Sequence, residues 1–344
     1  MTQRILLGSL VLAPIAIALD WLGASDVTIF VVAAVALIPL AWLIGEATEH
    51  AARHTGPGVG GFINATFGNA PELIIALLAV SHGLTDVVRG SLVGSVVGNL
   101  LLVLGFSLAF GGRGKLDRWS TLLSLWMVGV ATLAFLIPSI AGWSGDPERH
   151  SLAVISLPVS IALLALYLVA TRYSLRRHSV SHAAEPGVAG WSLRVSLAVL
   201  TVATVLTAFV AHAIVGSIES FAKQVGLSEF FVAAVIVAIV GNAAEHGGAV
   251  VVAARGQLKL AAEIALASSA QVAVFLIPAV QILSWAVKPP LPLAFRPVEI
   301  GALIGSAVLV TVLLAGGVSS RGRGIALIAG YVVVATAFYI AGDR

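Results

Sequence analysis

Long apolar stretches separated by short polar segments run through the whole chain of 344 residues. Eleven of them are long enough to cross a lipid bilayer, which takes about 20 apolar residues per helix. They cover residues 5–24, 27–46, 60–82, 88–111, 119–142, 151–171, 191–218, 229–254, 260–286, 298–317 and 324–342. A segment in hydrocarbon must satisfy its backbone polar groups internally, so each stretch predicts a transmembrane α-helix. We therefore expect an all-α integral membrane protein with about eleven transmembrane helices.

A five-residue motif occurs twice within these stretches, as GNAPE in the third and as GNAAE in the eighth. Each copy places an asparagine and a glutamate three residues apart on one helix face, Asn69 with Glu72 and Asn242 with Glu245. A carboxylate in the hydrocarbon region is costly and marks a functional site by default. Two of them at matching points of two halves predict one shared cation site at a repeat interface.

The basic residues predict the orientation of the chain in the membrane. With the N-terminus in the cytoplasm, 13 of the 19 Lys and Arg residues fall on the cytoplasmic side. The six on the outer side are Arg89, Arg149, Lys223, Lys288, Arg296 and Arg344. This bias favours a cytoplasmic N-terminus and an external C-terminus. The two motif helices then run in opposite directions, as in inverted repeats.

This orientation divides the chain into two inverted five-helix repeats and an extra N-terminal helix. We expect the extra helix in residues 1–25, the first repeat in 26–171, a cytoplasmic linker in 172–190 and the second repeat in 191–344. The first stretch has a second interpretation, because Arg4 opens it and Ala16-Ile17-Ala18 resembles a signal-peptide cleavage site.

Composition narrows the class of protein and the chemistry of its site. The chain is 59% hydrophobic and 10% charged, whereas a soluble domain has about 25% charged residues, so the lipid bilayer is its main partner. It has no cysteine, which excludes disulfides and thiolate metal sites. Oxygen ligands favour hard cations such as Ca²⁺, Mg²⁺ or Mn²⁺. The net charge of +3 is scattered among loops, so we expect no nucleic-acid partner.

The backbone around each motif is expected to contribute to the site. Pro71 has no N–H, and its ring crowds the carbonyl of Phe67. With Gly68 beside it, the helix should break and direct freed carbonyls into a cavity. The second copy has alanine in place of proline, so only Gly241 favours a break there.

The remaining motif side chains have two open interpretations each. Asn69 and Asn242 could supply amide oxygens to the ion or could hold neighbouring helices together. His246 could relay protons or tune Glu245, but it lies about 100° around the helix from that carboxylate.

Six further polar residues could line a proton or cation pathway, namely Ser95, Asn99, Ser268, Gln271, Glu46 and Glu49. The first four follow the motifs by about one helix and could instead only join helices. The last two end the second stretch, where a solvated helix end explains them equally well. Four glycines on the fourth stretch predict close helix packing, namely Gly90, Gly94, Gly98 and Gly105.

The segments GNAPELI, GNAAEH and SSAQVAVF resemble the calcium/proton exchanger (CAX) family of the cation/Ca²⁺ antiporter superfamily, and GEATEH and GSVVGNLLLVLG fit the same pattern. The resemblance covers everything except the first stretch. It implies an eleven-helix fold, Ca²⁺ held between Glu72 and Glu245 with help from backbone carbonyls, and segments 27–46 and 191–218 sliding to alternate access. Sodium-coupled relatives typically carry Thr and Ser where this chain has Asn69-Ala70 and Asn242-Ala243, which argues against sodium coupling.

The carboxylate pair itself suggests a mechanism. Two facing carboxylates in low dielectric cannot both stay ionised at low cost, so an empty site should hold protons that a divalent cation displaces. A site that holds either protons or one divalent cation, and that opens to each side of the membrane in turn, predicts an antiporter. Charge balance of the pair then predicts an exchange of one Ca²⁺ for about two protons. The alternatives are sodium-coupled exchange, Mn²⁺ or Mg²⁺ as the physiological ion and, less favoured, a cation channel.

Other functional classes are disfavoured by the sequence. We expect no enzymatic activity, because no nucleophile and base occur together and His212 has no evident partner. We expect no cofactor besides the transported Ca²⁺ and H⁺. Short loops without added domains predict a multi-pass protein of a prokaryotic cytoplasmic membrane, and the sequence does not indicate an oligomeric state.

Overall fold

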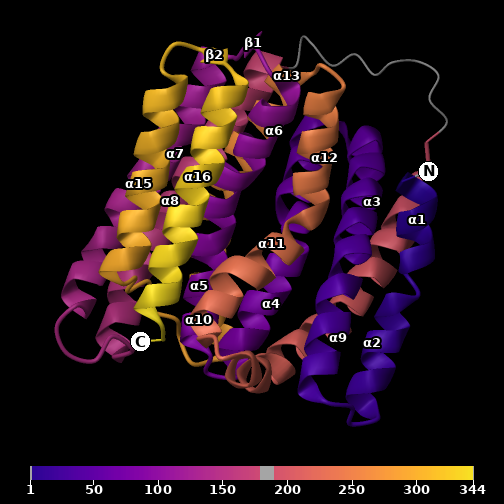
Figure 1. Ribbon diagram of the computed structural model, residues 1–344, viewed down its shortest axis with the longest axis vertical. Helices are drawn as coiled ribbons and strands as arrows, with labels where there is room; N and C mark the ends of the chain where they lie inside the picture. The colour runs from indigo at the N-terminus through magenta and orange to yellow at the C-terminus, as the bar shows by residue number, and fades with distance from the viewer. Residues whose placement is uncertain (1, 179–189, 344) are drawn as a thin grey trace.

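The computed structural model describes residues 2–178 and 190–343, which form a bundle of helices (Figure 1). The elements in chain order are α1 (Thr2–Ser9), α2 (Leu12–Trp21), α3 (Asp26–Gly68), α4 (Ala70–Ser81), α5 (Thr85–Val97), the π-helical η1 (Gly98–Val103), α6 (Leu104–Gly111), β1 (Gly114–Lys115), α7 (Arg118–Gly142), α8 (His150–His178), α9 (Leu193–Val225), α10 (Glu229–Phe231), the π-helical η2 (Val232–Val237), α11 (Ala238–Gly241), α12 (Ala243–Ala254), α13 (Leu258–Gln271), the π-helical η3 (Val272–Leu276), α14 (Ile277–Val287), α15 (Pro297–Leu314), β2 (Val318–Ser319) and α16 (Arg321–Ala341).

The helices have the lengths and composition of a multi-pass membrane protein. Among the described residues, eight helices are long and apolar enough to span a bilayer. A ninth candidate joins Glu229–Gly241 to Glu245–Ala254 across a bend of 57°, and two shorter apolar helices cover Ile5–Trp21 and Ala70–Ser81. The predicted class of helical integral membrane protein is thus confirmed. The count of eleven spans and the division into two inverted repeats stay predictions, and residues 179–189 of the expected linker lie outside the described residues.

The expected interruption between the second and third stretches is absent, because α3 continues through residues 47–59 and ends at Gly68. The first seven residues of this part, ATEHAAR at 47–53, include three alanines, a glutamate and an arginine, which are good helix formers. Two side-chain pairs stabilise this part of the helix, and each joins residues one helical turn apart. Glu49 contacts Arg53 at 2.6 Å, and Glu46 contacts His50 at 3.6 Å. The polar residues of this segment predict that the chain leaves the membrane here, but the helix itself continues to Gly68.

Within the first stretch, the apolar helical segment Ile5–Trp21 is divided by a turn, so the stretch consists of α1 and α2. Pro14 has no backbone N–H and cannot donate a hydrogen bond to the carbonyl of Leu10. That carbonyl accepts instead from the N–H of Ala13 at 3.1 Å, and the chain turns here between α1 and α2. The structure also departs from the all-α expectation, because it contains a two-stranded antiparallel ladder that pairs Gly114 with Ser319. This ladder connects the loop after α6 to the loop before α16.

The helices fall into three groups in Figure 1. The helices α2, α3 and α9 stand together on one side, α7, α8, α15 and α16 stand on the other, and the motif helices lie between them. The helix α3 packs along α9 and also contacts α4, α11 and α12. The broken motif helices therefore lie between two groups of helices.

A buried ion network joins the start of α5 to other helix ends. Arg89 is 1% exposed and contacts Glu148 at 2.7 Å and Asp86 at 3.0 Å. Arg296 pairs with the buried Glu299 at the start of α15. Two of the six basic residues assigned to the outer side are thus held inside the protein by carboxylates.

The glycines of α5 and α6 allow close helix contact at three of the four predicted positions. A Cβ on Gly94 would lie 2.0 Å from the carbonyl oxygen of Ala234 in η2. One on Gly90 would lie 2.9 Å from the Phe230 carbonyl, and one on Gly105 would lie 3.0 Å from the Gly324 carbonyl. The prediction is wrong for Gly98, because nothing lies within 4 Å of a Cβ added there.

We predict that Gly94→Ala lowers the free energy of unfolding by about 1–3 kcal/mol, because a backbone carbonyl cannot move aside for the methyl group. Thermal unfolding of the detergent-solubilised protein measures the effect as a lower midpoint temperature. The matched control is Gly98→Ala on the adjoining η1 segment, which should leave the midpoint unchanged or raise it slightly. Equal destabilisation by both substitutions would contradict the packing argument.

Candidate functional site

Both copies of the motif break their helix at the asparagine. Asn69 separates α3 from α4 with φ −104° and ψ 20°, and Pro71 lies in the first turn of α4. Asn242 separates α11 from α12 with φ −90° and ψ 4°. The first break was predicted from Pro71. The second occurs without a proline, so the motif interrupts the helix in either form.

The elements around the two breaks repeat at one offset along the chain. The helix α12 begins 173 residues after α4 (243 − 70), and α13 begins 173 residues after α5 (258 − 85). A π-helical segment follows α5 as η1 and follows α13 as η3. The duplication seen in the five-residue motif therefore extends over two consecutive helices of each half.

The glutamate of the first motif reaches the break of the second. Glu72 lies in the first turn of α4, and its Oε1 lies 3.5 Å from the position of a Cβ on Gly241. Its Oε2 is buried and has no hydrogen-bond partner among the described residues. Segments 173 residues apart in the sequence thus meet at one place.

The second motif is held by serines from two different helices. Glu245 lies in the first turn of α12, and its Oε2 accepts a hydrogen bond of 2.6 Å from Ser268 on α13. The Nδ2 of Asn242 donates to Ser95 on α5 at 2.9 Å and to the carbonyl of Ala238 at 2.9 Å. The amide oxygen of Asn242 is buried without a partner in the described part of the chain. This oxygen is free to act as a ligand.

The other predicted polar residues differ in their surroundings. Asn69 is 2% exposed at the first break, and Gln271 ends α13 in a partly buried position. Asn99 is fully buried in η1, and neither atom of its amide has a partner in residues 2–178 or 190–343. Such groups are costly unless water or an ion reaches them. Glu46 and Glu49 pair along the surface of α3 with His50 and Arg53.

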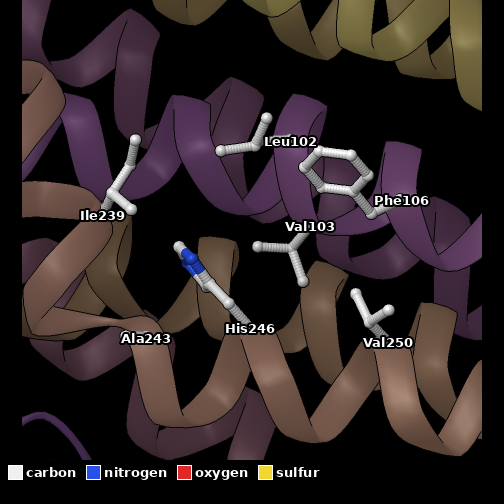
Figure 2. A pocket seen from close by; sticks show the side chains of 7 residues that line it. All are labelled: Leu102, Val103, Phe106, Ile239, Ala243, His246 and Val250. Atoms are coloured by element: carbon white, nitrogen blue, oxygen red, sulfur yellow. The ribbon is translucent and has the colours of Figure 1, made fainter. Parts of the chain in front are cut away.

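The His246 side chain enters an apolar pocket (Figure 2). The pocket has a volume of about 230 Å³ and is lined by Leu102, Val103, Phe106, Ile239, Ala243, His246 and Val250. The imidazole Nε2 is buried without a hydrogen-bond partner among the described residues. Its neighbours in the pocket are hydrocarbon side chains, so this geometry gives no direct support for tuning of Glu245 by His246.

The three π-helical segments were missed by sequence reasoning. The segment η2 leads through α11 into the second break, and η1 and η3 follow the helices that carry Ser95 and Ser268. Widened turns of this kind are frequent at functional sites. We find no residue pattern in the sequence that marks them.

The groups around the two breaks are oxygen donors. They are two carboxylates with amide, hydroxyl and backbone oxygens, which are ligand types typical of hard cations such as Ca²⁺. Among the described residues, no group of three or more His, Cys, Asp or Glu side chains could hold a metal.

Comparisons with known proteins identify the family of the chain. A family model described as "Sodium/calcium exchanger protein" matches residues 25–176 and 195–340. The chain is 35% identical to a Ca²⁺/H⁺ antiporter of Synechocystis sp., over 98% of this chain and 97% of that protein. It is 36% identical to the Ca²⁺/H⁺ antiporter ChaA of Bacillus subtilis, over 91% and 92%.

Solved structures show the same fold. The structure of native YfkE has a TM-score of 0.85 at 32% identity and covers 98% of this chain and 100% of that chain. The H⁺/Ca²⁺ exchanger CAX has a TM-score of 0.76 at 15% identity and covers 98% and 92%. At that identity the second likeness concerns the fold alone.

Proposed function

Because the chain belongs to the sodium/calcium exchanger protein family, we propose that it is a secondary active antiporter that exchanges Ca²⁺ for H⁺ across the membrane. The observation that carries the proposal is the contact of Glu72 with the helix break at Gly241, next to Glu245. Near full-length similarity to two Ca²⁺/H⁺ antiporters supports the choice of ions.

In this proposal the ion binds between the two motif glutamates. Glu72 and Glu245 supply the charge, and the free amide oxygen of Asn242 is placed to add a neutral ligand. Asn69 and the backbone carbonyls of Phe67, Gly68 and Gly241 complete the predicted set, because these carbonyls belong to the last residues of α3 and α11 before the two breaks. Ser268 orients Glu245 through its hydrogen bond.

Exchange follows from the charge balance of this pair. Two carboxylates in a poorly solvated site repel each other when empty, and protons or one divalent cation remove the repulsion. Protons and Ca²⁺ cannot be loaded together at low cost, so each displaces the other. This gives an exchange of one Ca²⁺ for about two protons.

Alternating access would come from movement of the α3 and α9 pair. These helices pack lengthwise against each other, and α3 also contacts the motif helices α4, α11 and α12. With residues 26–171 and 191–344 as inverted repeats, sliding of this pair would open the central site first to one side and then to the other. The orientation with the N-terminus inside and the C-terminus outside rests on the distribution of basic residues.

The alternative ions remain to be separated by experiment. The family description includes sodium, so sodium-coupled exchange is the second candidate. The asparagines at positions 69 and 242 and the similarity to proton-coupled antiporters favour protons. Mn²⁺ and Mg²⁺ use the same oxygen ligands as Ca²⁺ and should be tested as competitors.

We predict that purified protein in liposomes takes up ⁴⁵Ca²⁺ against its gradient when a pH gradient is imposed in the absence of sodium. Glu72→Gln and Glu245→Gln should each reduce uptake to the level of empty liposomes, because the remaining carboxylate cannot balance a divalent charge. A proton ionophore should collapse uptake by the wild type.

Three outcomes would count against the proposal. Uptake that requires a sodium gradient would favour sodium-coupled exchange. Flux that does not saturate and never moves uphill would favour a channel. Uptake that survives both substitutions would place the site elsewhere.

We predict that Ser268→Ala raises the half-saturating Ca²⁺ concentration about tenfold, because a hydrogen bond to a charged group contributes about 1.5 kcal/mol. The hydroxyl stabilises the ionised Glu245 that binds the cation. The matched control is Ser269→Ala, since the Ser269 hydroxyl donates to the Ala265 carbonyl of its own helix. Initial uptake rates over a range of Ca²⁺ concentrations measure the difference, and equal behaviour of the two variants would remove Ser268 from the site.

A further inference from the structure

Two histidines outside the candidate cation site lie ring to ring. His82 directly follows α4, and His212 lies within α9. Their ring centroids are 5.9 Å apart, with an angle of 56° between the ring planes. The sequence offered no partner for His212, since the two residues are far apart in the chain. The packing of α4 against α9 brings them together.

The contacts of His82 indicate which ring nitrogen is free. Its Nδ1 lies 2.9 Å from the carbonyl oxygen of Leu78 and 3.2 Å from the hydroxyl oxygen of Ser81. The Ser81 hydroxyl donates its hydrogen to the same carbonyl at 2.7 Å, and a carbonyl only accepts, so we assign the hydrogen of the imidazole to Nδ1. The neutral imidazole then has its lone pair on Nε2. An Nδ1–H bonded to a backbone carbonyl is also the arrangement that commonly orients a metal-binding histidine.

Both side chains are accessible from outside the protein. His82 and His212 are exposed, and in the described part of the chain His212 forms no hydrogen bond. The exposed face of α9 is apolar at Val205 and Phe209 and becomes polar from His212 to Glu219. This change marks the passage from lipid to water, so ions in solution can reach the pair.

We propose that His82 and His212 form a binding site for a divalent transition-metal ion such as Zn²⁺. Zinc lies about 2 Å from each ligating nitrogen, so two imidazoles on one tetrahedral ion have ring centres roughly 5–6 Å apart. Imidazole favours zinc, copper and nickel over Ca²⁺, so this ion differs from the proposed transported ion. No third His, Cys, Asp or Glu among the described residues joins them, and water completes the coordination.

The position of the pair gives the bound ion a regulatory effect. The helix α4 carries Glu72, and α9 belongs to the pair of helices that would slide. An ion held by both helices links them and opposes their relative movement. This consequence rests on the proposed antiport function, whereas the binding site does not.

Binding is tested on the full chain without an affinity tag, by Zn²⁺ titration against a chromophoric zinc indicator. The Glu72→Gln/Glu245→Gln background removes the carboxylates that could also bind zinc. His82→Ala, His82→Gln and His212→Ala should each weaken zinc binding at least tenfold, because loss of even an outer partner of a metal ligand costs about tenfold. The control His150→Ala removes an exposed histidine that contacts Trp285, and it should not change the titration. Equal affinity in all four variants would overturn the site.

Inhibition is tested by Ca²⁺ uptake into liposomes at increasing Zn²⁺ concentrations. His82→Ala and His212→Ala should leave uptake without zinc unchanged and should raise the half-inhibitory Zn²⁺ concentration at least tenfold, as expected when a metal ligand is lost. Zinc that binds at the pair without slowing uptake would overturn the regulatory effect. Inactive wild-type protein that still binds zinc through the pair would contradict the proposed function while supporting the site.

Discussion

The cost of placing charge in a poorly solvated interior governs the rest of this structure. Removing one ion from water costs several kcal/mol even after the protein relaxes, and Glu72 and Glu245 would impose that cost twice at one place. The chain keeps both carboxylates and places each in the first turn of a helix that begins at a break. Helix N-termini carry partial positive charge, so each break lowers the cost of its own carboxylate. The hydrogen bond from Ser268 lowers the cost for Glu245 further, and in the proposed site a bound cation or protons offset what remains.

Tight packing around the breaks keeps this arrangement in place. The helix α5, which carries Ser95, lies so close to η2 that glycine is required at position 94. Ser95 then reaches across to Asn242 of the other motif. The two serines have different hydrogen-bond partners. Ser268 donates to Glu245 of its own half, whereas Ser95 accepts from Asn242 of the opposite half. In the proposed alternating-access mechanism, such an asymmetric arrangement of two similar halves would correspond to one end state.

The sequence predicted the helical membrane architecture and the break at Pro71, because both depend on local properties. Apolar length and a missing N–H can be recognised residue by residue. The shared cation site of Glu72 and Glu245 stays a prediction. The continuation of α3, the π-helical segments and the open space at Gly98 could not be predicted, since they depend on neighbours from distant helices. The same holds for the direction of the His246 side chain and for the contact of His82 with His212. The predicted roles of Asn99, Gln271, Glu46 and Glu49 stay predictions.

Proton release during Ca²⁺ binding tests the central claim most directly. Ca²⁺ is added to the solubilised protein in weakly buffered solution, at a pH where the empty pair holds its protons, and the pH change is recorded. The account predicts release of about two protons for each Ca²⁺ bound, by charge balance of the pair. It also predicts neither binding nor release for the Glu72→Gln/Glu245→Gln variant. Ca²⁺ binding without proton release, or undiminished binding by the variant, would contradict the account.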